Sequence, residues 1–353
     1  MELPQLAQRS EILTGVQAGV RGLFPGYFAL VMATGIVSTA LLADGTTGLS
    51  VALLILAIIC YLVLLTAYGW RITSYRAEFL ADATSPVLAF SLFTFVAGSD
   101  VLGARLASAG YVAVTEILLV LAGAAWLLLS YGTPLVLITR HGDQSALAGI
   151  NGGWFLWAVG TQSIAVSVTS LAAPLPSGLA VLAVVMWSVG VVLYLILATL
   201  VLAGLLHFPV QPARLTPAYW VFMGATAISV LAGAKLLELP ASPLLAEMHP
   251  VVAGLSFILW AFGSWLVPLL VGLGVWRHLI RRFPLRYDPG LWSMSFPLGM
   301  YCVASETLGQ AVHVPWLVSV GHDGTWVAFA VWVLLFAAML AALASRFYSS
   351  TPT

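Results

Sequence analysis

Residues 24–38 read FPGYFALVMATGIVS: the turn-forming Pro25 precedes aromatic residues and then a run that mixes Gly, Ser and Thr with aliphatic side chains. Later stretches open in the same way, 61 to 72 residues apart, at Pro86, Gly152, Pro217 and Pro289. A recurrence of this length is typical of an internal repeat, and each unit pairs a segment containing polar residues with a more aliphatic one. The pattern predicts five helical hairpins around a central path.

The composition indicates an integral membrane protein. Of the 353 residues, 61% are hydrophobic and only 7% are charged, whereas a soluble globular domain carries about 25% charged residues. Apolar stretches long enough to cross a bilayer lie at 25–43, 49–68, 85–105, 111–137, 151–173, 178–206, 217–236, 250–275, 289–309 and 324–345. The first apolar run starts after about twenty mixed residues and lacks the cleavage site of a secretory signal, so we expect it to be retained.

The predicted fold is therefore an all-α integral membrane protein, with ten transmembrane helices arranged as five helical hairpins around a central pore. Residues 1–22 form a cytoplasmic N-terminal segment, residues 23–346 the ten-helix domain and residues 347–353 a cytoplasmic tail. Two cysteines, Cys60 and Cys302, both fall in apolar segments, where they are expected to be small buried residues rather than a disulfide.

The distribution of basic residues predicts the orientation. With the N-terminus inside the cell, the cytoplasmic segments contain eleven arginines and the opposite side contains only Arg105 and Lys235. Cytoplasmic loops of membrane proteins carry an excess of Lys and Arg. We therefore expect a multi-pass protein of the plasma membrane with both termini in the cytoplasm, which requires an even number of spans.

Hydroxyl and glycine residues are concentrated in the odd-numbered spans, whereas the even-numbered spans are almost entirely apolar. Two interpretations remain open, because small residues allow transmembrane helices to pack closely and hydroxyl groups also line polar pathways. Their recurrence on alternate spans favours a pathway. The candidate pore-lining residues are Thr34, Ser38, Thr94, Thr161, Ser163, Thr226, Ser229 and Ser295.

The starts of these spans carry helix N-terminal signals. Ser85, Thr216 and Asp288 each precede a proline, and Asn151 precedes a glycine, which is the pattern of a capped helix start. All five polar spans begin at the predicted cytoplasmic face, so the positive ends of their dipoles would favour anions there. Ordinary capping, together with the general bias in basic residues, is the alternative explanation.

Pro297 interrupts the ninth span, where a proline removes a backbone hydrogen bond and kinks a helix. Gly299 lies at a similar depth and would permit the same bend. Phe296 comes immediately before this predicted kink, and a bulky ring at such a point either closes a narrow pathway or is simply part of the packed core.

Ionisable residues within spans are candidates for function. Glu306 lies eighteen residues into the ninth span, near the predicted outer end of the path, where it is either a proton-binding site or a solvated vestibule residue. Asp100, Lys235 and Glu238 are expected to lie at the same outer rim.

The sequence offers little for catalysis or cofactor binding. The six histidines show no metal-ligand spacing, and the chain contains neither a glycine-rich phosphate loop nor a nucleophile elbow. We therefore expect no enzymatic activity, no cofactor, no metal site and no nucleic-acid partner, but contacts with membrane lipid and a small anion as substrate.

Five segments together resemble the tellurite-resistance/C4-dicarboxylate transporter (TDT) family, which is related to the plant slow anion channels. They are Phe24 to Ser38, Ala81 to Leu106, Asn151 to Ala165, Leu215 to Ala234 and Trp292 to Tyr301. The resemblance spans about residues 20 to 346. It implies five helical hairpins whose inner helices form an anion path closed by a phenylalanine on the ninth helix, here Phe296, and it implies a homotrimer.

The expected function is transport of small anions through a neutral, phenylalanine-gated path. None of the thirteen Lys and Arg residues is expected in the middle of a span, which favours a weakly binding channel over a carrier with fixed cations. The alternatives are a proton-coupled C4-dicarboxylate (malate) carrier and a sulfite- or tellurite-type oxyanion exporter. A membrane receptor or scaffold would be expected to carry a soluble output domain, which the chain lacks room for.

Overall fold

The computed structural model describes residues 15–139, 146–171, 175–207, 209–240 and 242–349. These parts of the chain are helical and contain no β-strand. The predicted N-terminal segment and C-terminal tail lie partly outside the described residues. Seven helices are long and apolar enough to cross a membrane, and the apolar helix Ala29–Ala43 is shorter. The count of ten spans therefore stays a prediction.

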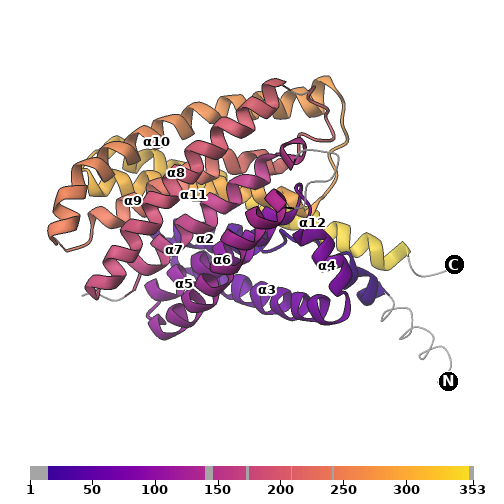
Figure 1. Ribbon diagram of the computed structural model, residues 1–353, viewed down its shortest axis with the longest axis horizontal. Helices are drawn as coiled ribbons and strands as arrows, with labels where there is room; N and C mark the ends of the chain where they lie inside the picture. The colour runs from indigo at the N-terminus through magenta and orange to yellow at the C-terminus, as the bar shows by residue number, and fades with distance from the viewer. Residues whose placement is uncertain (1–14, 140–145, 172–174, 208, 241, 350–353) are drawn as a thin grey trace.

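The helices form an inner and an outer set. The inner helices are α2 (Ala29–Ala43), α5 (Phe93–Ser108), α7 (Leu156–Thr169), α9 (Val221–Leu237) and α11 (Trp292–Ala311). The outer helices are α3 (Thr47–Ser74), α6 (Val112–Thr139), α8 (Ser177–His207), α10 (Pro243–Val275) and α12 (Pro315–Ser349). In Figure 1, α10 runs along one side of the bundle and α3 along the opposite side, with α2, α7 and α11 between them.

Burial separates the two sets. The spans containing α5 and α9 are 89% and 83% buried, whereas the five outer spans are only 22% to 33% buried. Each inner helix packs against the outer helix that follows it in the chain. The outer helices are apolar on all sides, as expected where side chains face lipid, and the inner helices are enclosed by them.

The inner helices close into a ring, because α2 contacts α5, α5 contacts α7, α7 contacts α9, α9 contacts α11, and α11 contacts α2. A glycine lies at each of these interfaces, where an added Cβ would meet the neighbouring helix or the turn before it. These are Gly35 and Gly98 between α2 and α5, Gly160 between α5 and α7, Gly152 before α7, Gly224 between α9 and α11, and Gly299 between α11 and α2. Missing side chains let helix backbones approach closely, so these glycines serve packing.

Aromatic side chains tie the outer set to the inner ring in a repeated way. If each inner helix is paired with the outer helix that follows it, an aromatic residue of every outer helix forms a hydrogen bond with the inner helix of the next pair. The outer helix of the last pair, α12, bonds to the inner helix of the first pair, α2. The bonds are Tyr61 to Ser99 (2.9 Å), Trp126 to Thr161 (2.9 Å), Trp187 to the Ser229 carbonyl (3.0 Å), Trp260 to Ser305 (2.8 Å) and Trp332 to Thr34 (3.0 Å). Each joins a polar group of an outer helix to one of the ring, so neither is left unpaired in an apolar environment.

Two outer helices begin earlier than predicted. Helix α10 starts at Pro243, where the Ser242 hydroxyl accepts a hydrogen bond from the Leu245 amide at 3.3 Å, and α12 starts at Pro315. Proline is favoured in the first turn because its missing amide costs no hydrogen bond there. As a result His322 lies in α12, where its Nδ1 contacts Asp44 Oδ1 at 2.9 Å.

Candidate functional site

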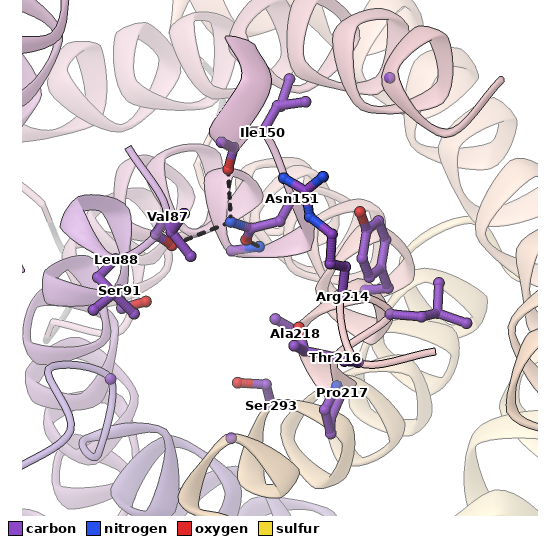
Figure 2. A pocket seen from close by; sticks show the side chains of 18 of the residues that line it. Val87, Leu88, Ser91, Ile150, Asn151, Arg214, Thr216, Pro217, Ala218 and Ser293 are labelled. Atoms are coloured by element: carbon purple, nitrogen blue, oxygen red, sulfur yellow. Dashed lines mark hydrogen bonds between the residues drawn. The ribbon is translucent and has the colours of Figure 1, made fainter. Parts of the chain in front are cut away.

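A cavity of about 380 Å³ opens where the five inner helices begin. We call it the vestibule. Its walls include Phe24 and Gly26 before α2, and Ser91, Asn151, Pro217 and Ser293 from the starts of the other four. Figure 2 shows Ser91, Asn151, Ala218 and Ser293 around the same open space. Segments nearly 270 residues apart in the sequence therefore line one site.

Four inner helices enter the vestibule through short 3₁₀ turns, at Ala89–Leu92, Gly152–Phe155, Pro217–Trp220 and Pro289–Leu291. Asn151 Oδ1 accepts a hydrogen bond from the Gly153 amide at 2.7 Å, and Asp288 Oδ1 accepts one from the Gly290 amide at 2.8 Å. The Ser85 hydroxyl accepts one from the Val87 amide at 3.3 Å. The prediction of capping is confirmed at Asn151 and Asp288. It is wrong for Thr216, whose side chain makes no capping bond, and for Ser85, which bonds within a turn before the helix start.

The charges and dipoles at the vestibule favour anions. The positive ends of helix dipoles attract negative charge, and their free amides can bind it directly. Arg214 and Asp288 are the charged residues in the described wall, and the Asp288 carboxylate is held by its cap. Arg214 is exposed and donates one hydrogen bond from Nη2 to the Ala148 carbonyl at 2.8 Å, which leaves other guanidinium donors for a ligand. Asn151 Nδ2 is occupied by the carbonyls of Val87 and Gly149.

Phe296 lies one turn deeper than Ser293 on α11, and its side chain is only 1% exposed. Helix α11 runs without a break from Trp292 to Ala311 through Pro297. If Gly224 carried a Cβ atom, this atom would lie 2.7 Å from the Pro297 ring. A Cβ atom on Gly299 would lie 3.1 Å from Val37. Both predicted kink residues are thus contact points of α11 with its neighbours in the ring. Phe296 is not among the residues that line the vestibule, and its assignment as a gate stays a prediction.

The eight predicted lining residues are all buried but do not converge on one site. Thr94 lines the vestibule. Thr34 and Thr161 accept hydrogen bonds from tryptophans of the outer helices, and Ser38 bonds to Ser50 on α3. Thr226 lies against Gly263 of α10, and Ser229 donates to the Ala225 carbonyl of its own helix. Ser163 donates to Asp100, while Ser295 Oγ has no partner among the described residues.

Glu306 lies away from the vestibule, in the second half of α11. It is half-buried, accepts a hydrogen bond from Gln310 Nε2 at 3.3 Å, and packs against Gly321 of α12. Its assignment as a proton or vestibule site stays a prediction. Within the described ranges no three His, Cys, Asp or Glu side chains group as a metal site.

Two buried charged residues were missed by the sequence interpretation, which placed both at the outer rim or loops. Asp100 is 0% and Arg105 is 2% exposed, both within α5. Arg105 donates hydrogen bonds to the hydroxyls of Ser38 (3.0 Å), Ser50 (2.9 Å) and Ser108 (3.1 Å). No local signal in the sequence indicates the burial of Asp100 and Arg105, because α5 is enclosed by helices from other parts of the chain.

Comparisons with known proteins identify relatives of this chain among membrane proteins. The family model described as "Voltage-dependent anion channel" (SLAC1) matches residues 23–340. An uncharacterised membrane protein of Mycobacterium tuberculosis is 51% identical over 153 residues, 43% of this chain and 78% of that protein. An uncharacterised transporter of Methanocaldococcus jannaschii is 24% identical over 328 residues, 89% of this chain and 92% of that protein.

A sulfite efflux pump of Trichophyton rubrum is 24% identical over 347 residues, 90% of each chain. The family match covers most of the chain, and the helices are those of a multi-pass membrane protein. The chain belongs to the voltage-dependent anion channel family of membrane transport proteins.

Proposed function

We propose that this protein conducts small monovalent anions along the axis of the inner ring, from the vestibule past Phe296. The observation that carries the proposal is the convergence of all five inner-helix starts on one cavity. Helix N-termini bind anions through amides and dipoles without a fixed counter-charge, and Arg214 adds a cation to the described wall of the vestibule. Such a site attracts anions but holds them weakly enough for passage.

Selectivity tests this proposal. A vestibule lined by amides, hydroxyls and apolar side chains cannot replace the hydration of a strongly hydrated dianion. Purified protein in liposomes is expected to pass nitrate more readily than chloride, and chloride more readily than sulfate. A preference for dianions at neutral pH would contradict the proposal and favour a carrier for C4-dicarboxylates such as malate.

Phe296 is the proposed gate. Phe296→Ala removes the aromatic ring from the proposed path and is expected to raise anion flux by about tenfold or more, with a smaller rise for Phe296→Leu. If Phe296 is only a core residue, truncation costs about 3 to 5 kcal/mol of stability and lowers the yield of folded protein instead. Flux per inserted protein, measured with thermal stability and monodispersity, separates these outcomes. A stable Phe296→Ala protein with unchanged low flux removes Phe296 from the gate.

Export of a sulfite-type oxyanion is the second candidate, because the fungal relative that matches 90% of the chain is named a sulfite efflux pump. Growth of cells with and without the protein in the presence of sulfite or tellurite tests export directly. Uptake of labelled malate driven by a proton gradient tests the dicarboxylate alternative.

We also propose that both termini are cytoplasmic, which puts the vestibule on the cytoplasmic side of the plasma membrane, and that the protein is a homotrimer. The eleven-to-two charge asymmetry supports the orientation. A cysteine at Arg282 is expected to react only from the cytoplasm and one at Gly110 only from outside, and the opposite labelling pattern would reverse the orientation. Mass measurement of the detergent-solubilised protein tests the trimer.

A further inference from the structure

Asp100 is a fully buried carboxyl group of the inner ring that the proposed anion path does not use. It is 0% exposed and lies on α5 about 10 Å beyond Phe93 along the helix axis, away from the vestibule. Ser163 of α7 donates a hydrogen bond from Oγ to Asp100 Oδ2 at 2.7 Å. Asp100 Oδ1 has no hydrogen-bond partner in the part of the chain that the structure describes.

The elements packed against this part of α5 provide no counter-ion. Helices α2 and α7 contain no titratable residue, and the acid on α6, Glu116, is exposed. From α3, Tyr61 bonds to the neighbouring Ser99 at 2.9 Å rather than to Asp100. The cation of the same helix, Arg105, bonds to the three serines described above.

An ionised carboxylate in this position would be buried without a cation among the described residues, which is a costly arrangement at membrane depth. A protonated carboxyl group needs only hydrogen-bond partners, and Asp100 Oδ1 then carries a proton to donate. Buried acids in such surroundings are the usual components of proton relays in transport proteins.

Three serine hydroxyls lie on one face of α7 between Asp100 and the end of the helix, with no hydrogen bond from one serine to the next among the described residues. Ser163, Ser167 and Ser170 follow at the i, i+4 and i+7 spacing that puts side chains on one helix face. Ser167 is buried with an unpartnered Oγ, and Ser170 ends the helix and is half-buried. Hydroxyls both donate and accept hydrogen bonds, so this row can pass a proton between Asp100 and the helix end opposite the vestibule.

We propose that Asp100 is a proton-binding site that makes anion passage depend on pH. The anion passes while the carboxyl group is protonated and is repelled when the group is ionised, because a charge in a low-dielectric ring acts strongly on a nearby ion. The proton enters from water along the Ser170 to Ser163 row and returns by the same route. This inference rests on the proposed anion path and adds its regulation by protons.

Flux measured in liposomes against pH tests the proposal. Wild-type flux is expected to fall as pH rises, by up to about tenfold per pH unit, the rate at which the protonated fraction of a single ionised carboxyl declines. Asp100→Asn keeps the size and the Ser163 contact but cannot ionise, so its flux stays high at every pH. The matched control Glu116→Gln, on the exposed face of α6, keeps the wild-type profile. An Asp100→Asn protein that retains the wild-type pH profile overturns the proposal.

Infrared spectroscopy of the purified protein gives a readout that needs no transport. The wild type should show the carbonyl stretch of a protonated carboxylic acid that titrates together with the flux, and the band should be absent from Asp100→Asn. Ser163→Ala should shift the band, because it removes the hydrogen bond to Asp100. If none of the tested anions passes even through the Phe296→Ala protein, the proposed function fails. The infrared band then still shows whether Asp100 binds a proton. If the wild type conducts anions at a rate that does not depend on pH, and its spectrum lacks the band, the proposed anion transport stands but the proton-binding site is rejected.

Discussion

The starts and the middles of the inner helices use the same residue types for different purposes. At the starts, Ser91, Thr94 and Ser293 border the vestibule. In the middles, Thr34, Ser99 and Thr161 bond to aromatic side chains of the outer helices, and Gly224 and Gly299 are contact points of the ring. A polar or small residue in a transmembrane helix therefore indicates a pathway only once the direction of its side chain is known.

The starts and the middles differ because their polar groups find different hydrogen-bond partners. Four unpaired amides at each helix start need water, a cap or a ligand, so an open cavity at the starts is stable. In the middle every backbone amide is bonded within the helix, and the remaining polar atoms are side chains in apolar surroundings. Some of those side chains, such as Thr34 and Thr161, accept a hydrogen bond from a tryptophan of an outer helix, which closes the ring instead of opening it.

The close packing of the inner-helix starts can be disrupted by a substitution at Gly152. A Cβ at this position would overlap the backbone of Ala218 and Tyr219, and a backbone cannot move aside as a flexible side chain can. Gly152→Ala is expected to cost about 3 kcal/mol, at the upper end for overpacking, and to lower the yield of monodisperse protein. Gly178→Ala, where a Cβ meets open space, is the control and should behave as wild type. A fully stable Gly152→Ala protein would show that the starts are not tightly packed.

The strength of the hydrogen bonds between outer-helix aromatic side chains and the middles of the inner helices can be measured at Trp126 and Thr161. A double-mutant cycle with Trp126→Phe and Thr161→Val should give a coupling of about 0.6 to 1.7 kcal/mol, the range found for hydrogen bonds between membrane helices. Unfolding in mixed detergent measures this coupling. The control is Thr66→Val, which loses only hydrogen bonds within its own helix. If Thr161 instead lines the path, Thr161→Val alters anion selectivity and shows no coupling to Trp126.

A substitution at Arg214 tests whether positive charge at the starts of the inner helices attracts anions. Arg214→Gln removes the cation of the vestibule wall and should lower anion flux about threefold at low salt, with less effect at high salt because the charge is screened. Its thermal stability should equal wild type, since the side chain is exposed and makes a single hydrogen bond. Arg76→Gln, an exposed arginine outside the vestibule wall, is the control. Equal losses in both variants would mean that only the general surface charge matters.

The smallest effect is expected at the surface pair Arg21 and Glu78, whose side chains are 64% and 33% exposed. Hydrogen bonds from its own backbone amide and from Arg21 lower the pKa of Glu78. The stabilisation is thus present above the unfolded-state pKa and is lost as pH falls through the lower folded-state pKa. Glu78→Gln should leave the thermal midpoint unchanged within error at neutral pH. A clear drop at neutral pH, absent in acid, would show that this pair anchors α4 (Arg76–Ala83).

The sequence by itself determined the class of the protein, the repeat and the starts of the inner helices. The low charge content requires a membrane environment, and Pro, Asn and Asp at the openings specify helix starts through local hydrogen bonds, as Asn151 and Asp288 show. Such signals act over a few residues, so they are readable without knowledge of the fold. The ten-span topology and the gate at Phe296 follow from pattern and family resemblance and stay predictions.

Only the tertiary structure decided which way the side chains of the inner helices point. These helices are enclosed by apolar neighbours on all sides, so hydrophobic periodicity does not mark an inward or an outward face. The partner of Thr34 is Trp332, 298 residues away, and no local rule predicts such a pair. The burial of Asp100 and Arg105 has the same origin, because their hydrogen-bond partners include serines of α2, α3 and α7.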